Sequence, residues 1–109
     1  MALGLEILKK IIRIEIVVNE ESLDSLIKLF RDANVHGYTI IKGAGGLGST
    51  GERNPDDYIL QQPNAIVVLA CEENQAKSII MILHTELKDF GGMCLVSECQ
   101  WVLGPAASY

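Results

Sequence analysis

The segment 64–71, NAIVVLAC, constrains the fold most, because it is apolar on both sides of any strand that it forms. Strands of this kind lie inside a sheet and need cover on both faces. If Ile66, Val68 and Ala70 face a layer of helices, then residues 67, 69 and 71 must line the opposite face. The rest of the chain therefore has to provide a sheet around this segment and something that covers each face.

The N-terminal half supplies two further strands and a helix. Residues 11–18, IIRIEIVV, alternate, with Ile12, Ile14, Ile16 and Val18 on one face, which predicts a strand. Residues 19–34 predict an amphipathic helix with Asn19 as its N-cap and Glu20 in its first turn. Its apolar stripe is Leu23, Leu26, Ile27, Phe30 and Ala33. A second strand is expected from Gly37 to about Lys42.

The C-terminal half repeats this arrangement. Residues 73–90 place Ala76, Ile79, Ile80, Leu83 and Leu87 on one helical stripe, and MCLVSECQWV reads as a last strand. The order predicts an α+β, ferredoxin-like βαββαβ fold with an antiparallel four-stranded sheet and both helices on one face. We expect one domain over residues 1–109, with an N-terminal extension at 1–10.

Such a fold leaves the second sheet face without helices. Apolar residues from segment 64–71 line this face together with Ile11, Val17 and one alternating set from Met93 to Val96. An apolar patch of this kind is not expected to stay in contact with water. The sequence therefore predicts self-association into a closed symmetric oligomer.

The composition limits which binding partners and which cellular compartment are expected for this protein. The net charge of −5 and the pI near 4.9 argue against nucleic-acid binding. The sequence has no apolar run of about 18 residues, so no direct membrane insertion is expected. Three cysteines without C-x-x-C spacing, Cys71, Cys94 and Cys99, indicate free thiols in a cytoplasmic protein.

A glycine-rich segment follows the second strand, and residues 43–63 form a long loop without an apolar pattern. The run Gly43 to Gly48 satisfies G-x-G-x-x-G, but STGERNPDD after it cannot begin the helix that a dinucleotide-binding fold needs. Two interpretations stay open: a surface loop without a ligand, or a functional loop whose backbone N–H groups approach a ligand closely. We expect residues 46–62 to lack fixed structure when no ligand or partner is bound.

The sequence gives little support for a catalytic site or a metal site. His36 lies before a strand and His84 lies on a helix, and neither has a matching carboxylate or cysteine nearby in sequence. We therefore expect no enzymatic activity and no metal cluster. An RNA-recognition sheet needs stacked aromatic residues, and only Tyr38 and Trp101 are near strands. A copper chaperone needs paired thiols in an early loop, and VVNEES has none.

The stretch VHGYTIIKGAGG, with the order of elements and the long loop, resembles the PII signalling superfamily over residues 11 to about 103. Gly37-Tyr38-Thr39 and Lys42-Gly43-Ala44-Gly45 stand where that family has Gly-x-Thr and the Lys-Gly-x-Gly base of its T-loop. The resemblance implies a homotrimer that binds an adenine nucleotide between subunits. It also implies that the T-loop, residues 43–63, controls a protein partner.

Carried onto this chain, the resemblance names two groups of residues. The nucleotide-binding group is Gly37, Thr39, Lys42, Gly43, Gly45, Gly91 and Gly92. The partner-binding group on the T-loop is Gly46, Ser49, Arg53, Asp57 and Tyr58. No cofactor is required, and no covalent modification is transferred to Tyr58.

The departures from the family pattern concern phosphate binding. KDFGGMCLV lacks the lysine that usually follows the glycines of the second loop, CQWVLGPAASY lacks the usual C-terminal basic residues, and Gly46 replaces an arginine. These losses weaken ATP binding and favour fewer phosphates. The resemblance implies AMP, ADP, cyclic AMP or ATP as the ligand. The sequence is similar in this respect to divergent PII-like proteins of bicarbonate transporters and carboxysomes, which implies a membrane transporter as a candidate partner.

Two alternatives remain open at this level. One is a PII-like module that binds a protein partner without a small ligand. The other is a CutA-like metal-responsive trimer, which shares the topology but lacks such a long glycine-rich loop. Titration with nucleotides, copper and zinc separates the three.

Overall fold

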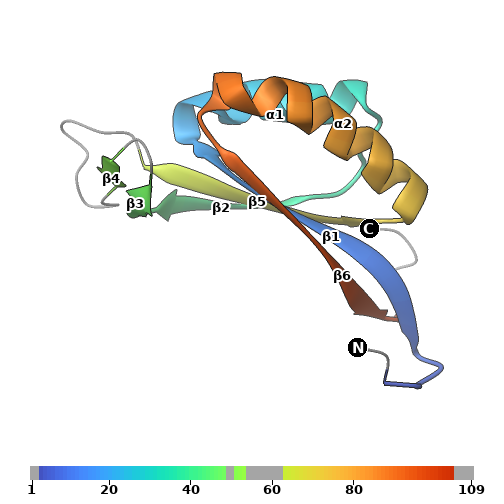
Figure 1. Ribbon diagram of the computed structural model, residues 1–109. Helices are drawn as coiled ribbons and strands as arrows, with labels where there is room; N and C mark the ends of the chain where they lie inside the picture. The colour runs from blue at the N-terminus through green and yellow to red at the C-terminus, as the bar shows by residue number, and fades with distance from the viewer. Residues whose placement is uncertain (1–2, 49–50, 54–62, 105–109) are drawn as a thin grey trace.

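The computed structural model describes residues 3–48, 51–53 and 63–104. Four strands form one antiparallel sheet in the order β2-β5-β1-β6: β1 (Leu8–Asn19), β2 (Thr39–Ala44), β5 (Asn64–Cys71) and β6 (Met93–Val102). The helices are η1 (Glu20–Ser22), α1 (Leu23–Asp32) and α2 (Glu73–Phe90). Both long helices cover the same face of the sheet (Figure 1). The predicted ferredoxin-like α+β fold is confirmed.

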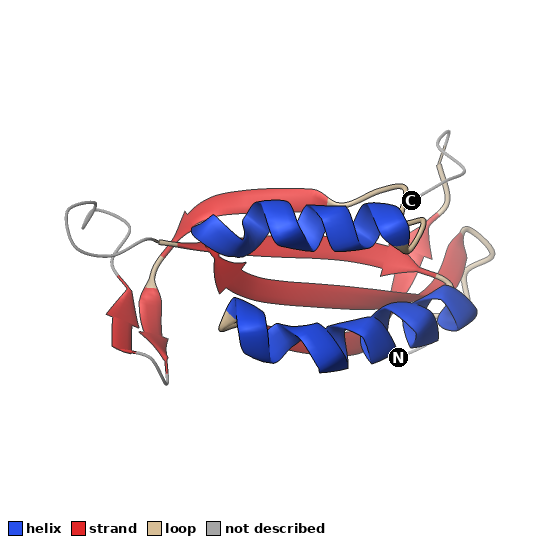
Figure 2. Ribbon diagram, turned by 90° about the horizontal axis from the view of Figure 1, so that it is seen from above, coloured by secondary structure: helices blue, strands red, loops and turns tan. Residues whose placement is uncertain are grey.

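The helix-covered face holds the core. The β1 and β5 residues that face the helices pair across the two central strands, with Ile14 opposite Leu69 and Ile16 opposite Val67. These four side chains are between 0 and 3% exposed. On the helix side of the sheet they pack against the apolar stripes of α1 and α2, which include Leu26, Phe30, Ile79 and Leu83. The two helices lie side by side over the strands (Figure 2).

The register corrects one expectation for β5. Ala65, Val67, Leu69 and Cys71 are buried under the helices, whereas Ile66, Val68 and Ala70 lie on the helix-free face. The opposite arrangement was predicted. The error arose because both alternating sets of side chains on this strand are apolar, so the sequence pattern alone does not show which set faces the helices. The pairing with β1 decides it.

We call the helix-free side of the sheet the open face. Its apolar members are Ile11, Val17, Ile41, Ile66, Val68, Ala70, Met93 and Leu95. Ile41, Met93 and Leu95 are each about half exposed, at 51, 52 and 53%. The predicted apolar second face is therefore present, although β5 contributes Ile66, Val68 and Ala70 to it and not residues 67, 69 and 71.

Helix α1 ends where the sequence allows a left-handed residue. Asn34 has a φ of 61°, which asparagine tolerates better than most residues. The Val35 N–H donates to the Phe30 carbonyl at 2.9 Å, and the Asn34 N–H donates to the Arg31 carbonyl at 3.1 Å. This pair of hydrogen bonds closes the helix and directs the chain into β2.

The segment after β2 contains structure that the sequence did not predict. Gly46–Gly48 (β3) and Gly51–Arg53 (β4) pair as an antiparallel hairpin, separate from the main sheet. It projects beyond one end of the sheet (Figures 1 and 2). The expectation of no fixed structure over residues 46–62 is thus wrong for these two strands, since backbone pairing forms without an apolar alternation. Residues 49–50 and 54–62 lie outside the described ranges.

Candidate functional site

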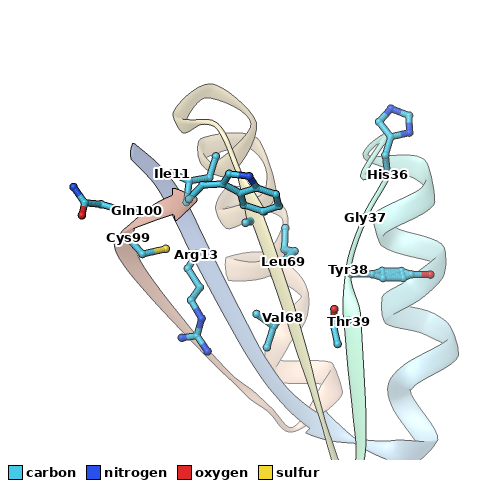
Figure 3. Close-up of a pocket in the computed structure, with 12 residues that line it drawn as sticks. Ile11, Arg13, His36, Gly37, Tyr38, Thr39, Val68, Leu69, Cys99 and Gln100 are labelled. Atoms are coloured by element: carbon cyan, nitrogen blue, oxygen red, sulfur yellow. The ribbon is translucent and has the colours of Figure 1, made fainter. Parts of the chain in front are cut away.

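A hollow of about 460 Å³ lies at one end of the open face, between the start of β2 and the end of β6. Gly37 and Thr39 line it together with Arg13, Val68 and residues of β6 (Figure 3). The other lining residues are Ile11, His36, Tyr38, Leu69, Ala70, Cys99, Gln100 and Trp101. Two of the residues predicted to bind nucleotide therefore belong to a concave surface that combines apolar and hydrogen-bonding groups.

Tyr38 contributes to this end of the sheet mainly by packing. Its ring lies 5.6 Å from that of Phe30, centroid to centroid, at 42°. In Figure 3 the side chain extends from β2 toward α1, away from Val68 and Thr39. Successive side chains of an extended chain point to opposite faces. Because Tyr38 points toward the helices, Thr39 lies on the open face, where its hydroxyl is available to a ligand.

One ion pair lies on the open face. Arg13 Nη1 is 3.2 Å from Glu15 Oε2, and both residues lie on β1 two positions apart, so they share a face. The Arg13 side chain is 42% exposed and the Glu15 side chain 26%. Arg13 also lines the hollow, and β5 lies between its strand and Thr39.

At the other end of the sheet, Glu20 lies close to both Gly43 and Pro63. The Gly43 N–H donates to Glu20 Oε2 at 2.8 Å, and the Glu20 N–H donates to the Pro63 carbonyl at 3.0 Å. Glu20 therefore contacts the chain on both sides of the segment between β2 and β5. Gly43 has a φ of 77°, a left-handed conformation that glycine adopts without strain.

The Gly91-Gly92 turn lies against this same end. Gly91 has a φ of 62° and caps the C-terminus of α2. A Cβ on Gly92 would lie 2.2 Å from the Val17 carbonyl oxygen and 2.8 Å from Val18 Cγ1. Both glycines thus have a local structural role, whether or not a ligand contacts them.

The seven residues assigned to nucleotide binding form two groups at opposite ends of β5. Gly37 and Thr39 lie near Ala70, whereas Gly43 and Gly45 flank Ala44, the β2 residue that pairs with Asn64. Gly37 and Gly43 are six residues apart along the chain, about 20 Å, whereas Thr39 and Gly43 are four residues apart, about 13 Å. Lys42, Gly91 and Gly92 belong to the second group, and Lys42 is exposed. Within one subunit the two groups do not meet.

The residues assigned to the partner-binding loop are only partly described. Gly46 opens β3 and Arg53 closes β4, so the hairpin brings these two positions opposite each other. Ser49, Asp57 and Tyr58 lie outside the described residues.

Two polar residues at these ends were not singled out from the sequence. The alternation of residues 11–18 implies that Arg13 faces away from Ile12 and Ile14, but its place in the hollow depends on strand order. Glu20 was expected only to favour the dipole of the following helix. Its contact with Gly43 spans 23 residues, and no local pattern signals it.

The three cysteines carry free thiols, as predicted. Burial raises the pKa of the Cys71 thiol and that of Cys94 above the usual range. A raised pKa keeps a thiol protonated at neutral pH, and the protonated thiol is a poor nucleophile.

A short pulse of iodoacetamide at pH 7.5 should therefore leave Cys71 and Cys94 largely unlabelled in the folded protein, whereas all three cysteines should react after denaturation. Peptide mass spectrometry measures the labelled fraction at each position. Equal labelling of Cys71 in the folded and denatured protein would contradict its burial.

Within the described residues, no three His, Cys, Asp or Glu side chains gather in a way that could hold a metal ion. His36 and His84 are both exposed. None of the helices in the described part of the chain is long and apolar enough to span a bilayer.

Comparison with solved structures gives a consistent fold. CPII, a nitrogen regulatory PII-like protein from Thiomonas intermedia K12 in complex with ADP, AMP and bicarbonate, is similar with a TM-score of 0.78. The two chains are 20% identical, and the match covers 87% of this chain and 91% of CPII. The apo form of CPII matches with a TM-score of 0.66 at 20% identity, covering 86% of this chain and 94% of that one.

A PII-like signalling protein from Thermus thermophilus matches with a TM-score of 0.65 and 20% identity, covering 87% of this chain and 91% of that protein. No curated protein matches the sequence. The family model for nitrogen regulatory protein P-II matches residues 11–103, which include β1 from Ile11 onward, the other three strands of the sheet and both long helices. The chain belongs to the nitrogen regulatory protein P-II family.

Proposed function

We propose that this protein is a non-enzymatic regulatory homotrimer that binds an adenine nucleotide in clefts between subunits and contacts a protein partner through residues 43–63. The observation that carries the proposal is the separation of the two glycine-containing groups along β5. Thr39 and Gly43 lie about 13 Å apart along β2, and the Gly37–Thr39 end lines a hollow on the helix-free face, which a second subunit would cover. Two neighbouring subunits can bring the Thr39 end of one against the Gly43 end of the other.

The open face supports assembly. It carries half-exposed Ile41, Met93 and Leu95 on the same side of the sheet as Ile66 and Val68. Burial of such a surface between subunits removes apolar area from water. The Arg13–Glu15 ion pair lies on the same face, so its two charges compensate each other if the face is covered.

For the ligand, we propose that the base lies near Gly37 and Thr39 and that the phosphates lie near the N–H groups of Gly43 and Gly45. Lys42 and the Gly91-Gly92 turn complete the phosphate end. CPII was solved with ADP, AMP and bicarbonate, which supports an adenine nucleotide with few phosphates. AMP, ADP, cyclic AMP and ATP are the candidates, and bicarbonate is a candidate second ligand.

For the partner, the β3–β4 hairpin offers a projecting element beyond the sheet (Figure 2). Gly46 and Arg53 lie across from each other on it. We propose a protein partner here, with a membrane transporter as the candidate, and a cytoplasmic location for the complex.

Isothermal calorimetry tests the ligand. AMP or ADP should bind at least as tightly as ATP, because the described part of the phosphate end offers Lys42 and backbone donors but lacks the family's usual lysine after the glycines. Each missing charge-assisted hydrogen bond weakens binding by about 1.5–3 kcal/mol, roughly ten- to a hundredfold.

In the same experiment, Gly43→Val should abolish binding, because a β-branched residue is strained at a φ of 77° and the N–H must turn away. Gly46→Val is the matched control, since Gly46 has no left-handed φ and a Cβ there meets no atom within 4 Å. Tight ATP binding by Gly43→Val would place the site elsewhere.

Binding of a partner without any adenine nucleotide would instead favour the module that has lost its small ligand. One observation favours this second candidate: in the chain itself, the Gly43 N–H already has the Glu20 carboxylate as its acceptor. Binding of copper or zinc in a parallel titration would favour the metal-responsive alternative.

A further inference from the structure

Glu20 holds the chain on both sides of the segment between β2 and β5. Its backbone N–H donates to the Pro63 carbonyl at 3.0 Å, just before β5 begins. Its side-chain Oε2 accepts from the Gly43 N–H at 2.8 Å, close to the end of β2. The first contact needs no side chain, whereas the second depends on the carboxylate alone.

The carboxylate makes the contact that a phosphate oxygen would make. A hydrogen bond from a backbone N–H to an ionised oxygen is charge-assisted and stronger than its neutral counterpart. Gly43 has no side chain, and the space where a Cβ would lie is open to 4 Å. Gly43 is exposed, and its N–H donates to an anionic oxygen of the protein itself.

The surroundings show which ligands could compete for this position. Lys42 is exposed and adjacent to Gly43, so one positive charge is near. Glu21 is also exposed and follows Glu20 directly, which adds a second carboxylate to the same turn. An incoming phosphate must displace the Glu20 carboxylate from the N–H and then remain beside it.

We propose that Glu20 is a specificity-determining residue that limits the number of phosphate charges which the site accepts. The inference rests on the nucleotide site proposed above. A monophosphate brings about two negative charges to the displaced carboxylate. A triphosphate brings more, and like charges repel at this range. Glu20 thus favours AMP over ATP independently of any missing lysine.

The test compares Glu20→Gln with Glu21→Gln. Each variant removes one negative charge from the same turn, but only the first alters the group on the Gly43 N–H. The glutamine side-chain oxygen can still accept that hydrogen bond, so the turn keeps its structure. Calorimetry should show the ratio of ATP affinity to AMP affinity rising about tenfold in Glu20→Gln and staying unchanged in Glu21→Gln.

Equal ratios in the wild-type protein and in Glu20→Gln, with AMP still bound, would overturn the inference and leave the proposed function intact. A second measurement does not need the adenine base. Tripolyphosphate should shift the Gly43 amide resonance in Glu20→Gln at a concentration about tenfold lower than in the wild-type protein.

If no adenine nucleotide binds any variant but tripolyphosphate still shows this difference, the proposed function fails and the role of Glu20 stands. If tripolyphosphate leaves the Gly43 amide unmoved in Glu20→Gln, the role of Glu20 fails.

Discussion

Val67→Asp should yield no stably folded protein, whereas Ile66→Asp should yield a folded monomer. Val67 is 0% exposed beneath the helices, and an isolated carboxylate there costs several kcal/mol, about as much as the whole stability of a small domain. Ile66 lies on the open face, opposite Val17 of β1 and Ile41 of β2. A charge at Ile66 remains hydrated in the monomer and opposes only the covering of that face.

The two positions are neighbours on one strand, so each variant is the control for the other. Circular dichroism reports folding, and light scattering distinguishes the 11.9 kDa chain from an assembly of three times that mass. An Ile66→Asp protein with the same mass in solution as an oligomeric wild-type protein would show that this part of the open face is not the interface. A folded Val67→Asp protein would contradict the register of β5.

Gly92→Ala should lower the free energy of unfolding by about 3 kcal/mol or more. The added Cβ would lie 2.2 Å from the Val17 carbonyl oxygen, and a backbone atom of a central strand cannot give way as a flexible side chain can. Urea denaturation, monitored by circular dichroism, measures the change.

Gly104→Ala is the matched control for this prediction, because a Cβ at that position meets no atom within 4 Å. Gly91→Ala should fall between the two, at about 1 kcal/mol, since its cost comes from a φ of 62°. Unchanged stability of Gly92→Ala together with lost nucleotide binding would assign Gly92 to the ligand and not to packing.

The sequence predicted the elements well because each has a local pattern. The alternation of residues 11–18 and the helical stripes such as Leu26-Phe30 reappear in the core, and the antiparallel sheet follows from their order. The prediction of which β5 residues face the helices was wrong, because the strand is apolar on both faces and the local sequence does not distinguish them. Only the pairing of Ile14 with Leu69 decides it.

Of the candidate site, the sequence indicated the glycines, Thr39 and Lys42, but not their arrangement in space. The stretch from Gly37 to Gly45 could be matched to a family pattern, but its division between two ends of the sheet needs the length and direction of β5. The Glu20–Gly43 hydrogen bond and the close approach of Gly92 to Val17 join residues far apart in sequence. Patterns along the chain do not encode such contacts, so no inspection of neighbouring residues would have found them.

The length of β5 has a genetic consequence if each cleft combines the Thr39 end of one subunit with the Gly43 end of the next. A subunit damaged at Thr39 and a subunit damaged at Gly43 are each inactive alone, yet they complement each other when they assemble in one ring. A three-membered ring that contains both kinds always has one cleft with two intact halves. Two recessive alleles of this gene can therefore restore ligand binding in the same cell, at one cleft in three.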